Sequence, residues 1–169
     1  MSRWKSSLEV AVNVAILCVC VLIGVIGVKK FLLHSPDTAA LMPQKGTRLE
    51  LAGVDWSRAD RTLVMALSTQ CHFCSESAGF YQRLLPAATV SKVPVVAVFP
   101  QPTNEARAYW TSQNLPLGGV DLEQAPMERI RVSGTPTLIV VDRKGLILRA
   151  WAGKLPAQGE AEVIKAIQD

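Results

Sequence analysis

The apolar residues of this chain form one long run near the N-terminus and several short runs after it. The long run covers residues 10–28 and is interrupted only by Asn13. The short runs cover 62–67, 93–99 and 137–141, which is the length of a strand. Continuous apolar runs of this length are typical of strands that are buried on both faces. The pattern therefore predicts a sheet with a buried centre.

Between these runs, apolar positions recur every three or four residues, which predicts helices. One helix is expected over 73–90, where Pro86 should kink or end it because proline has no backbone N–H. Further helices are expected over 105–113 and 126–132, and from Pro156 to the C-terminus. Strands that alternate with helices predict an α/β fold with a mixed sheet covered on both faces.

Weaker signals complete the predicted sheet. Apolar residues alternate with others over 46–56, which predicts a short edge strand, and another short strand is expected over 120–122. Asp-Arg-Lys-Gly at 142–145 reads as a hairpin turn, with a return strand over 146–151.

The N-terminal apolar run has the length of a membrane span. Nineteen helical residues reach about 28 Å, close to the thickness of a bilayer core, whereas a signal-peptide core has roughly 7–15 residues. We interpret the run as a single uncleaved transmembrane helix; a long, cleaved signal sequence is the alternative. The predicted organisation is an anchor with its flanks over 1–33, a linker over 34–45 and one globular domain over 46–169.

The formal net charge of +4 comes mostly from the flanks of this run. From Ser35 onward there are 14 Lys and Arg against 13 Asp and Glu, with no basic patch in the sequence that suggests nucleic-acid binding. The two flanks carry nearly equal positive charge, so the positive-inside rule does not set the orientation of the segment. The sequence also contains a Cys-His-Phe-Cys (CxxC) motif at 71–74, and a tethered protein with such a motif usually serves an oxidising compartment, so we expect the domain on the periplasmic side of a bacterial inner membrane.

The four cysteines form two different pairs. Cys18 and Cys20 lie in the apolar run, where cysteine behaves as a small hydrophobic residue; acylation or an inter-subunit bond remain alternatives. Cys71 and Cys74 lie where a predicted strand gives way to a predicted helix. A thiol at a helix N-terminus is stabilised as thiolate, the nucleophile of disulfide exchange, and a second cysteine one turn later can form a disulfide with it. The pair predicts reversible thiol–disulfide exchange.

A second motif, Ser-Gly-Thr-Pro-Thr at 133–137, lies immediately before the third apolar strand. A proline at the start of a strand can adopt the cis form at modest cost. The backbone before it would then be free to pair with an incoming peptide. An ordinary Gly-Pro turn is the alternative interpretation.

A strand, CxxC and helix, followed about sixty residues later by Gly-Thr-Pro-Thr, a hairpin and a terminal helix, resembles the thioredoxin superfamily. The segments 67–74 and 134–145 look like its membrane-anchored TlpA/ResA-type branch. The resemblance covers roughly 46–169 and implies a thioredoxin-like fold, with a central mixed sheet flanked by helices, and no cofactor. It also implies residue roles: Cys71 attacks, Cys74 resolves and is buried, Pro136 is the cis-proline, and the backbone of Thr135 pairs with substrate.

Several positions depart from the familiar pattern of this superfamily. Gln70 replaces the tryptophan common before the first cysteine, and Met65 replaces a buried acid. Another group or water must then handle the proton of the second cysteine; Glu76 is one candidate, or is simply a solvated helix residue. His72 could tune the pair by favouring thiolate, although a cation at a helix N-terminus opposes the dipole. Phe73 could supply an apolar contact for partners.

These observations lead to one main functional hypothesis and two alternatives. The main hypothesis is a membrane-anchored thiol–disulfide oxidoreductase that exchanges disulfides with partner proteins. The resemblance implies a reductant, as in cytochrome c or copper-centre maturation, supplied by a membrane thiol electron donor, although the sequence does not decide the direction of exchange. One alternative is a copper-binding module that uses Cys71, His72 and Cys74. Peroxide reduction is disfavoured because the residues before the cysteines do not match its motif.

Overall fold

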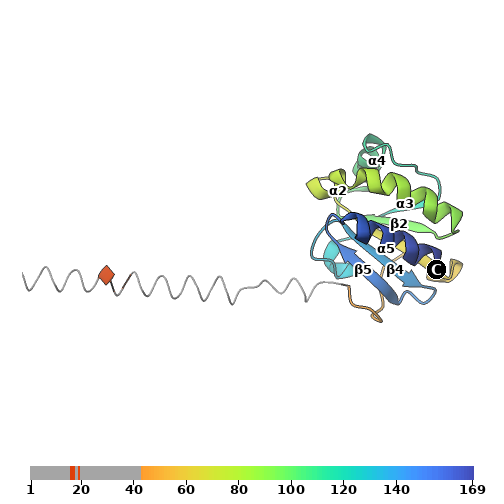
Figure 1. Ribbon diagram of the computed structural model, residues 1–169, viewed down its shortest axis with the longest axis horizontal. Coiled ribbons are helices and arrows are strands. Elements are labelled where there is room, and N and C mark those ends of the chain that lie inside the picture. The colour runs from red at the N-terminus through yellow and green to blue at the C-terminus, as the bar shows by residue number, and fades with distance from the viewer. Residues whose placement is uncertain (1–15, 18, 20–42) are drawn as a thin grey trace, which may run out of the picture. The chain divides into compact units, whose positions relative to one another are not determined.

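The computed structural model describes Ile16, Leu17, Val19 and residues 43–169, and residues 41–169 form a compact unit of their own (Figure 1). Most of the anchor predicted over 10–28 lies outside the described residues. Within the described residues, no helix is both long and apolar enough to cross a bilayer.

A five-stranded mixed sheet forms the centre of the domain, in the order β3-β2-β1-β4-β5. Neighbours among β1, β2 and β3 are parallel, whereas β4 is antiparallel to both β1 and β5. The strands are β1 (Arg61–Ala66), β2 (Val95–Phe99), β3 (Val120–Gln124), β4 (Thr137–Asp142) and β5 (Ile147–Ala152). The strands predicted from the three short apolar runs are confirmed as β1, β2 and β4.

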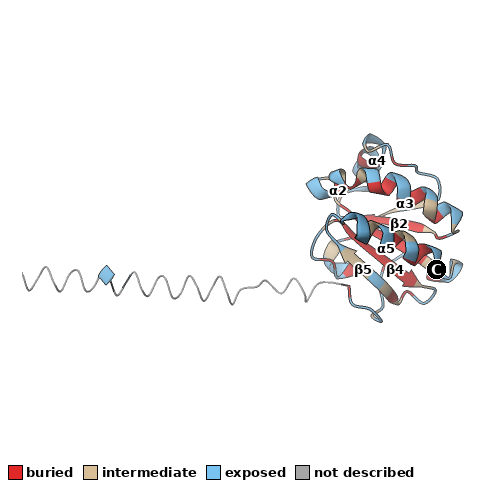
Figure 2. Cartoon of the chain, in the orientation of Figure 1, coloured by how far each residue is buried: buried red, intermediate tan, exposed pale blue. Residues whose placement is uncertain are grey.

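The central strands are apolar because both faces of the sheet are covered. Leu63 and Met65 of β1 belong to one hydrophobic cluster, and Val64 and Ala66 to a second cluster on the opposite face. All four are fully buried. Figure 2 shows the buried positions concentrated in the sheet and on the inner sides of the helices.

The helices pack mainly against one face of this sheet. Side chains of α3, α4 and α5 share a cluster with Leu63 and Met65. The other face is covered by residues 49–56 and by the segment around Ile130. The helices are α2 (His72–Glu76), α3 (Ala78–Val90), α4 (Thr103–Ser112) and α5 (Ala157–Gln168), with short 3-10 helices η2 (Trp56–Arg58) and η3 (Met127–Ile130).

The single helix predicted over 73–90 is two helices, separated at Ser77. The Ser77 hydroxyl donates to the carbonyl oxygen of Phe73 at 2.8 Å, and such a local bond competes with the regular helical pattern. Pro86 does not end α3, which continues to Val90. Pro86 is exposed, so water can satisfy the carbonyl that it leaves without an amide partner.

The edge strand predicted over 46–56 is not formed. This segment makes a single bridge, between Arg48 and Leu146, and then turns through Gly53 at φ +86°. The helix predicted over 126–132 is the 3-10 helix η3, which ends at Arg131 in the left-handed region. The remaining predicted elements, including the terminal helix, are confirmed with boundaries shifted by a few residues.

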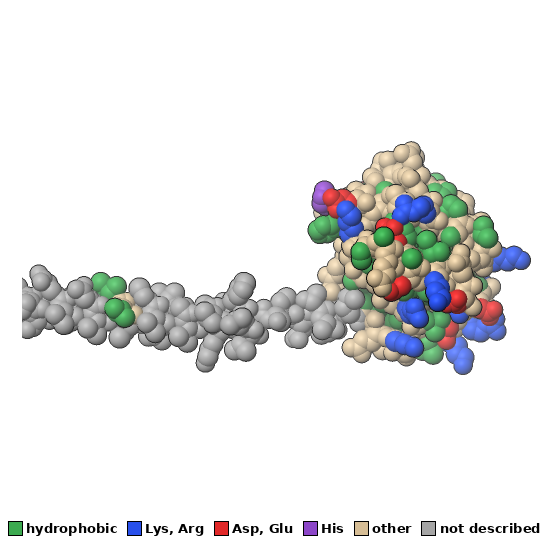
Figure 3. Space-filling model, viewed as in Figure 1, with side chains coloured by type: hydrophobic (Ala, Val, Ile, Leu, Met, Phe, Trp, Pro, Cys, Tyr) green, Lys and Arg blue, Asp and Glu red, His purple; other side chains and the backbone are tan. Residues whose placement is uncertain are grey.

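The strand register separates two ends of the sheet. Ala66, the last residue of β1, pairs with Thr137, the first residue of β4, so the CxxC and the Gly-Thr-Pro-Thr motif meet at one end. Arg61, the first residue of β1, pairs with Asp142 at the opposite end, where the β4–β5 hairpin turns. Figure 3 shows Lys and Arg side chains along the lower and right-hand margin of the domain.

Candidate active site

Cys71 lies at the N-terminus of α2 as its N-cap residue, with extended backbone angles. The backbone N–H of Cys74 donates to the sulfur of Cys71 at 3.1 Å. The first N–H groups of a helix have no partner within the helix, and here one of them points at sulfur. This arrangement stabilises negative charge on that atom, so the predicted environment of the nucleophile is present.

Cys71 and Cys74 form a disulfide, with their Cα atoms 5.2 Å apart. The two cysteines differ in accessibility, because Cys71 is partly exposed whereas Cys74 is fully buried. A protein partner can therefore reach only the first sulfur. Attack by Cys71 and resolution by Cys74 stay the roles that the resemblance implies.

The Gly-Thr-Pro-Thr motif lies beside the disulfide. The Thr135–Pro136 peptide bond is cis, and the carbonyl oxygen of Thr135 lies 3.2 Å from the sulfur of Cys71. In the reduced protein the Cys71 thiol can donate to this oxygen. The loop is held from both sides: the hydroxyl of Thr137 donates to the carbonyl of Gly134 at 2.7 Å, and the N–H of Gly153 donates to the carbonyl of Pro136 at 2.7 Å.

Thr135 keeps an unused main-chain donor next to the reactive sulfur. Its backbone N–H makes no hydrogen bond with any other described residue. The residue is half-buried, so this N–H is at the surface of the site rather than in the core. An extended peptide that approaches Cys71 would therefore meet an unpaired main-chain group.

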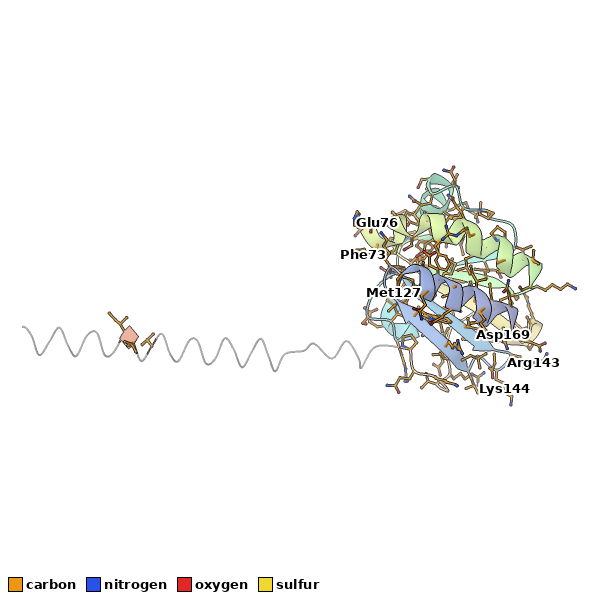
Figure 4. The ribbon with its side chains drawn as sticks, in the orientation of Figure 1. Phe73, Glu76, Met127, Arg143, Lys144 and Asp169 are labelled. Atoms are coloured by element: carbon orange, nitrogen blue, oxygen red, sulfur yellow. A yellow bond between two sulfur atoms is a disulfide. The ribbon has the colours of Figure 1, made fainter. Side chains whose placement is uncertain are left out.

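The two residues between the cysteines project outward. The side chain of His72 is 79% exposed, and Phe73 is 55% exposed, which is high for a large apolar residue. Figure 4 shows Phe73 at the tip of this end of the domain, near Glu76. A large exposed apolar side chain beside a reactive sulfur suits contact with another protein.

Glu76 lies on the surface and contacts a histidine and a lysine. One carboxylate oxygen lies 3.1 Å from Nε2 of His72, and the other accepts from Nζ of Lys154 at 3.1 Å. The pKa of Glu76 is lowered, chiefly by the hydrogen bond from Lys154 and less by His72. Glu76 is thus a solvated residue that orients His72, and its contacts lie outside the core that surrounds Cys74.

Two tyrosines near this end were not recognised in the sequence as polar groups of the site. The hydroxyl of Tyr109 lies 3.3 Å from Oγ of Ser75, on the outer turn of α2. Tyr81 is almost completely buried in the cluster that contains Cys74, and its hydroxyl has no hydrogen-bond partner among the described residues. Burial raises the pKa of both phenols. Their helical spacing indicates only core positions, so the sequence gives no signal for these hydroxyls.

The fold of this domain is thioredoxin-like, and it carries a CxxC pair at disulfide distance at the start of a helix. Solved structures with this architecture include a thioredoxin-family thiol:disulfide interchange protein from Chlorobium tepidum. That structure is 14% identical at a TM-score of 0.56, over 75% of this chain and 98% of its own.

Two further neighbours have the same architecture. The thioredoxin domain of a thiol-disulfide oxidoreductase from Bacteroides vulgatus is 15% identical at a TM-score of 0.54, over 76% of this chain and 98% of its own. StoA from Bacillus subtilis is 17% identical at a TM-score of 0.50, over 72% of this chain and 84% of its own. No protein-family model and no curated protein sequence matches the chain. Two of these three neighbours are described as thiol–disulfide oxidoreductase or interchange proteins, and the likeness of all three to this chain is one of fold.

Proposed function

We propose that this chain is a protein thiol–disulfide oxidoreductase. The observation that carries the proposal is the Cys71–Cys74 disulfide at the N-terminus of α2, beside the cis Thr135–Pro136 bond. One sulfur is accessible and stabilised as thiolate, the second is buried behind it, and an unpaired backbone lies alongside. These are the parts that a two-step disulfide exchange needs.

The reaction begins with the reduced pair. The thiolate of Cys71 attacks one sulfur of a partner disulfide, and a mixed disulfide forms while the other partner sulfur leaves as thiolate. Cys74 then loses its proton, and its sulfur attacks the sulfur of Cys71. The second partner thiolate is released, the Cys71–Cys74 disulfide forms, and two electrons have moved to the partner. The same steps in reverse oxidise a dithiol.

The partner segment is held by the Thr135–Pro136 loop. The free N–H of Thr135 pairs with a carbonyl of an extended substrate strand, as the resemblance to thioredoxins implies. Phe73 adds an apolar contact, and His72 tunes the thiolate from the exposed side of α2. Substrates are therefore proteins that present a disulfide or dithiol in an extended, accessible segment.

We further propose that residues 10–28 anchor the enzyme in a bacterial inner membrane, with the domain on the periplasmic side. The apolar run supports the anchor, and the need for an oxidising compartment supports the orientation. The resemblance to the TlpA/ResA-type branch supports reducing work, such as cytochrome c or copper-centre maturation. A membrane thiol protein would then supply the electrons.

No observation favours the copper-binding alternative. Cys71 and Cys74 are bonded to each other, and Nε2 of His72 contacts Glu76. The three side chains are thus engaged with other groups.

The proposal is tested by trapping the mixed disulfide. A Cys74→Ala variant keeps the nucleophile and loses the resolving sulfur, so it should accumulate adducts through Cys71 that mass spectrometry identifies. Cys71→Ala is the matched control, because the remaining sulfur of its CxxC pair, that of Cys74, is buried, and both variants keep Cys18 and Cys20. Equal adduct levels in the two variants would refute the mechanism. A reduction potential near −270 mV would support a reductant, and one near −120 mV an oxidant.

A further inference from the structure

Cations collect at the end of the domain opposite Cys71. We name this surface the basic end and define it by five residues from different elements: Lys45, Arg61, Lys92, Lys144 and Arg149. In Figure 4, Lys144, together with its neighbour Arg143 and the C-terminal Asp169, lies at the far end of the domain from Phe73 and Glu76.

Two surface hollows bring four of these five residues together, all except Lys144. A cavity of about 210 Å³ is lined by Lys45, Arg61 and Arg149, and by Asp169. A second cavity of about 540 Å³ is lined by Arg61, Lys92 and the same Asp169. The two cavities share Arg61 and Asp169, so they form one continuous surface around the C-terminus.

The positive charge of the basic end is not neutralised within the domain. Lys45, Lys92, Lys144 and Arg149 are exposed, and none of them forms an ion pair with any described residue.

The nearby acids are partly engaged in other contacts. Asp60 pairs with Arg143 at 2.5 Å, and the carboxylate of Asp142 accepts the backbone N–H groups of Lys144 and Leu146. The C-terminal Asp169 adds two carboxylates to this surface. The five cations of the basic end therefore face three carboxylates, those of Asp142 and Asp169, that form no ion pair with a described residue.

We propose that the basic end binds the anionic phospholipid headgroups of a bilayer surface. The inference rests on the proposed membrane anchor, because a tethered domain meets its own bilayer at high effective concentration. Fourteen residues, 29–42, separate the apolar run from Pro43, and a chain of that length reaches at most about 50 Å, so the domain stays near the bilayer. Lys45 follows directly, so the basic end contains the point where the linker joins the domain.

Charge complementarity favours anionic phospholipid headgroups as the ligand of the basic end. Lys and Arg near an anionic leaflet strengthen association about fivefold each, and they bind phosphate oxygens directly. The surface has little exposed apolar area for a protein partner: Phe73 lies at the opposite end of the domain, and Val90, two residues before Lys92, is the large exposed apolar residue beside the basic end in the described part of the chain. Lipid binding at this surface leaves the Cys71 end accessible to substrates.

The test uses the full chain reconstituted in vesicles of phosphatidylcholine alone or with phosphatidylglycerol. Hydrogen–deuterium exchange is read at residues 58–61, 89–93 and 142–150, and at 71–76 as an internal reference. We expect slower exchange at the first three segments only with phosphatidylglycerol, and loss of this protection in 1 M salt, where the Debye length falls to about 3 Å.

Two charge-matched variants sharpen the test. Lys92→Glu/Lys144→Glu/Arg149→Glu changes three exposed cations of the basic end, and should weaken docking by at least about 100-fold and abolish protection. Arg107→Glu/Arg129→Glu/Arg131→Glu changes the net charge by the same amount at exposed positions elsewhere, and this variant should keep the protection from exchange.

Each outcome separates the lipid inference from the proposed function. Equal exchange with both lipids, or equal loss of protection in both triple variants, would overturn lipid binding. Flotation of the chain with phosphatidylcholine vesicles reports the anchor separately, and adduct trapping in detergent reports the enzyme chemistry. Protection at the basic end by an added acidic protein but not by phosphatidylglycerol would also overturn the proposal.

Discussion

Replacement of Gly145 by alanine tests the packing of the β4–β5 hairpin. Gly145 has a φ of +76°, in the left-handed region that disfavours side chains. A Cβ atom at this position would lie 2.8 Å from Cδ1 and 2.9 Å from Nε1 of Trp56. The Trp56 ring is buried at 8% exposure, so it has little room to move away.

The expected loss of stability has two parts. An alanine in the left-handed region costs about 1–2 kcal/mol relative to glycine. The forced displacement of a packed ring adds about 1–3 kcal/mol, as in other overpacked cores. The free energy of unfolding should therefore fall by about 2–5 kcal/mol in Gly145→Ala, a large share of the 5–15 kcal/mol typical of a domain.

Gly153→Ala is the matched control, because Gly153 has a φ of +77° but a Cβ there would meet nothing within 4 Å. Urea unfolding of the full chain in mild detergent, followed by circular dichroism, gives both losses. Gly153→Ala should lose only about 1–2 kcal/mol, from backbone strain. If the two variants lose the same stability within about 0.5 kcal/mol, the Trp56 contact does not restrict the hairpin and the reasoning is wrong.

Further predictions concern the site and its surroundings. Tyr81→Phe removes a buried hydroxyl without a partner, so its unfolding free energy at neutral pH should equal or exceed that of the parent by up to about 1 kcal/mol. Because burial raises the Tyr81 pKa in the folded state, the parent should lose stability as the pH rises above about 10, and Tyr81→Phe should lose less. Lys154→Met should raise the lowered pKa of Glu76 toward its ordinary value in an NMR titration. Because folding lowers the pKa of Glu76, the Glu76–Lys154 pair stabilises the folded state at pH values above the ordinary pKa of this residue, and the stabilisation disappears as the pH falls. Acid should therefore lower the unfolding free energy of the parent more than that of Lys154→Met. Equal acid sensitivity of the two proteins would count against this reasoning. In the reduced protein at neutral pH, iodoacetamide should modify Cys71 faster than free cysteine while Cys74 stays protected, and an ordinary rate at Cys71 would contradict the thiolate assignment.

The strands of the sheet centre could be predicted because burial on both faces requires apolar residues throughout. β1, β2 and β4 meet this condition, and each follows a continuous apolar run. The segment 46–56 has alternating apolar residues for a different reason: Leu49 and Leu51 pack on the sheet face, while the backbone bonds the β4–β5 hairpin only around one isolated bridge and does not continue as a strand. Alternation in a sequence does not separate these two cases.

The helix break at Ser77 could not be predicted from residue type. Serine is common at helix ends but also tolerated inside helices, and a bond like that from the Ser77 hydroxyl to the Phe73 carbonyl also forms at Thr89, where α3 stays intact. Pro86 was expected to kink or end the helix, and it does not end it, because this proline is accommodated on the exposed side of α3. Tertiary packing of Leu84, Leu85 and Ala88 holds that helix on both sides of the proline.

The reactive sulfur and its neighbouring loop could be predicted because short motifs specify them. The CxxC and the Gly-Thr-Pro-Thr segment contain their chemistry in adjacent residues. Groups that long-range packing brings near the site, such as the pair of Tyr109 and Ser75, could not be found in this way. The partnership of Glu76 with Lys154 joins residues 78 positions apart and is equally invisible in the sequence.

The separation of α2 from α3 at Ser77 has a consequence for the energetics of catalysis. A helix of five residues is far below the length that persists alone in water. The covalent ring between Cys71 and Cys74, the Ser77 hydroxyl and the Tyr109 phenol hold its single turn in place. Opening of that ring removes one of these restraints while α3 stays packed on the sheet. The redox state of the CxxC pair thus changes how readily one helical turn unfolds locally. A partner would distinguish the oxidised from the reduced form by the mobility of this turn rather than by a change in its shape.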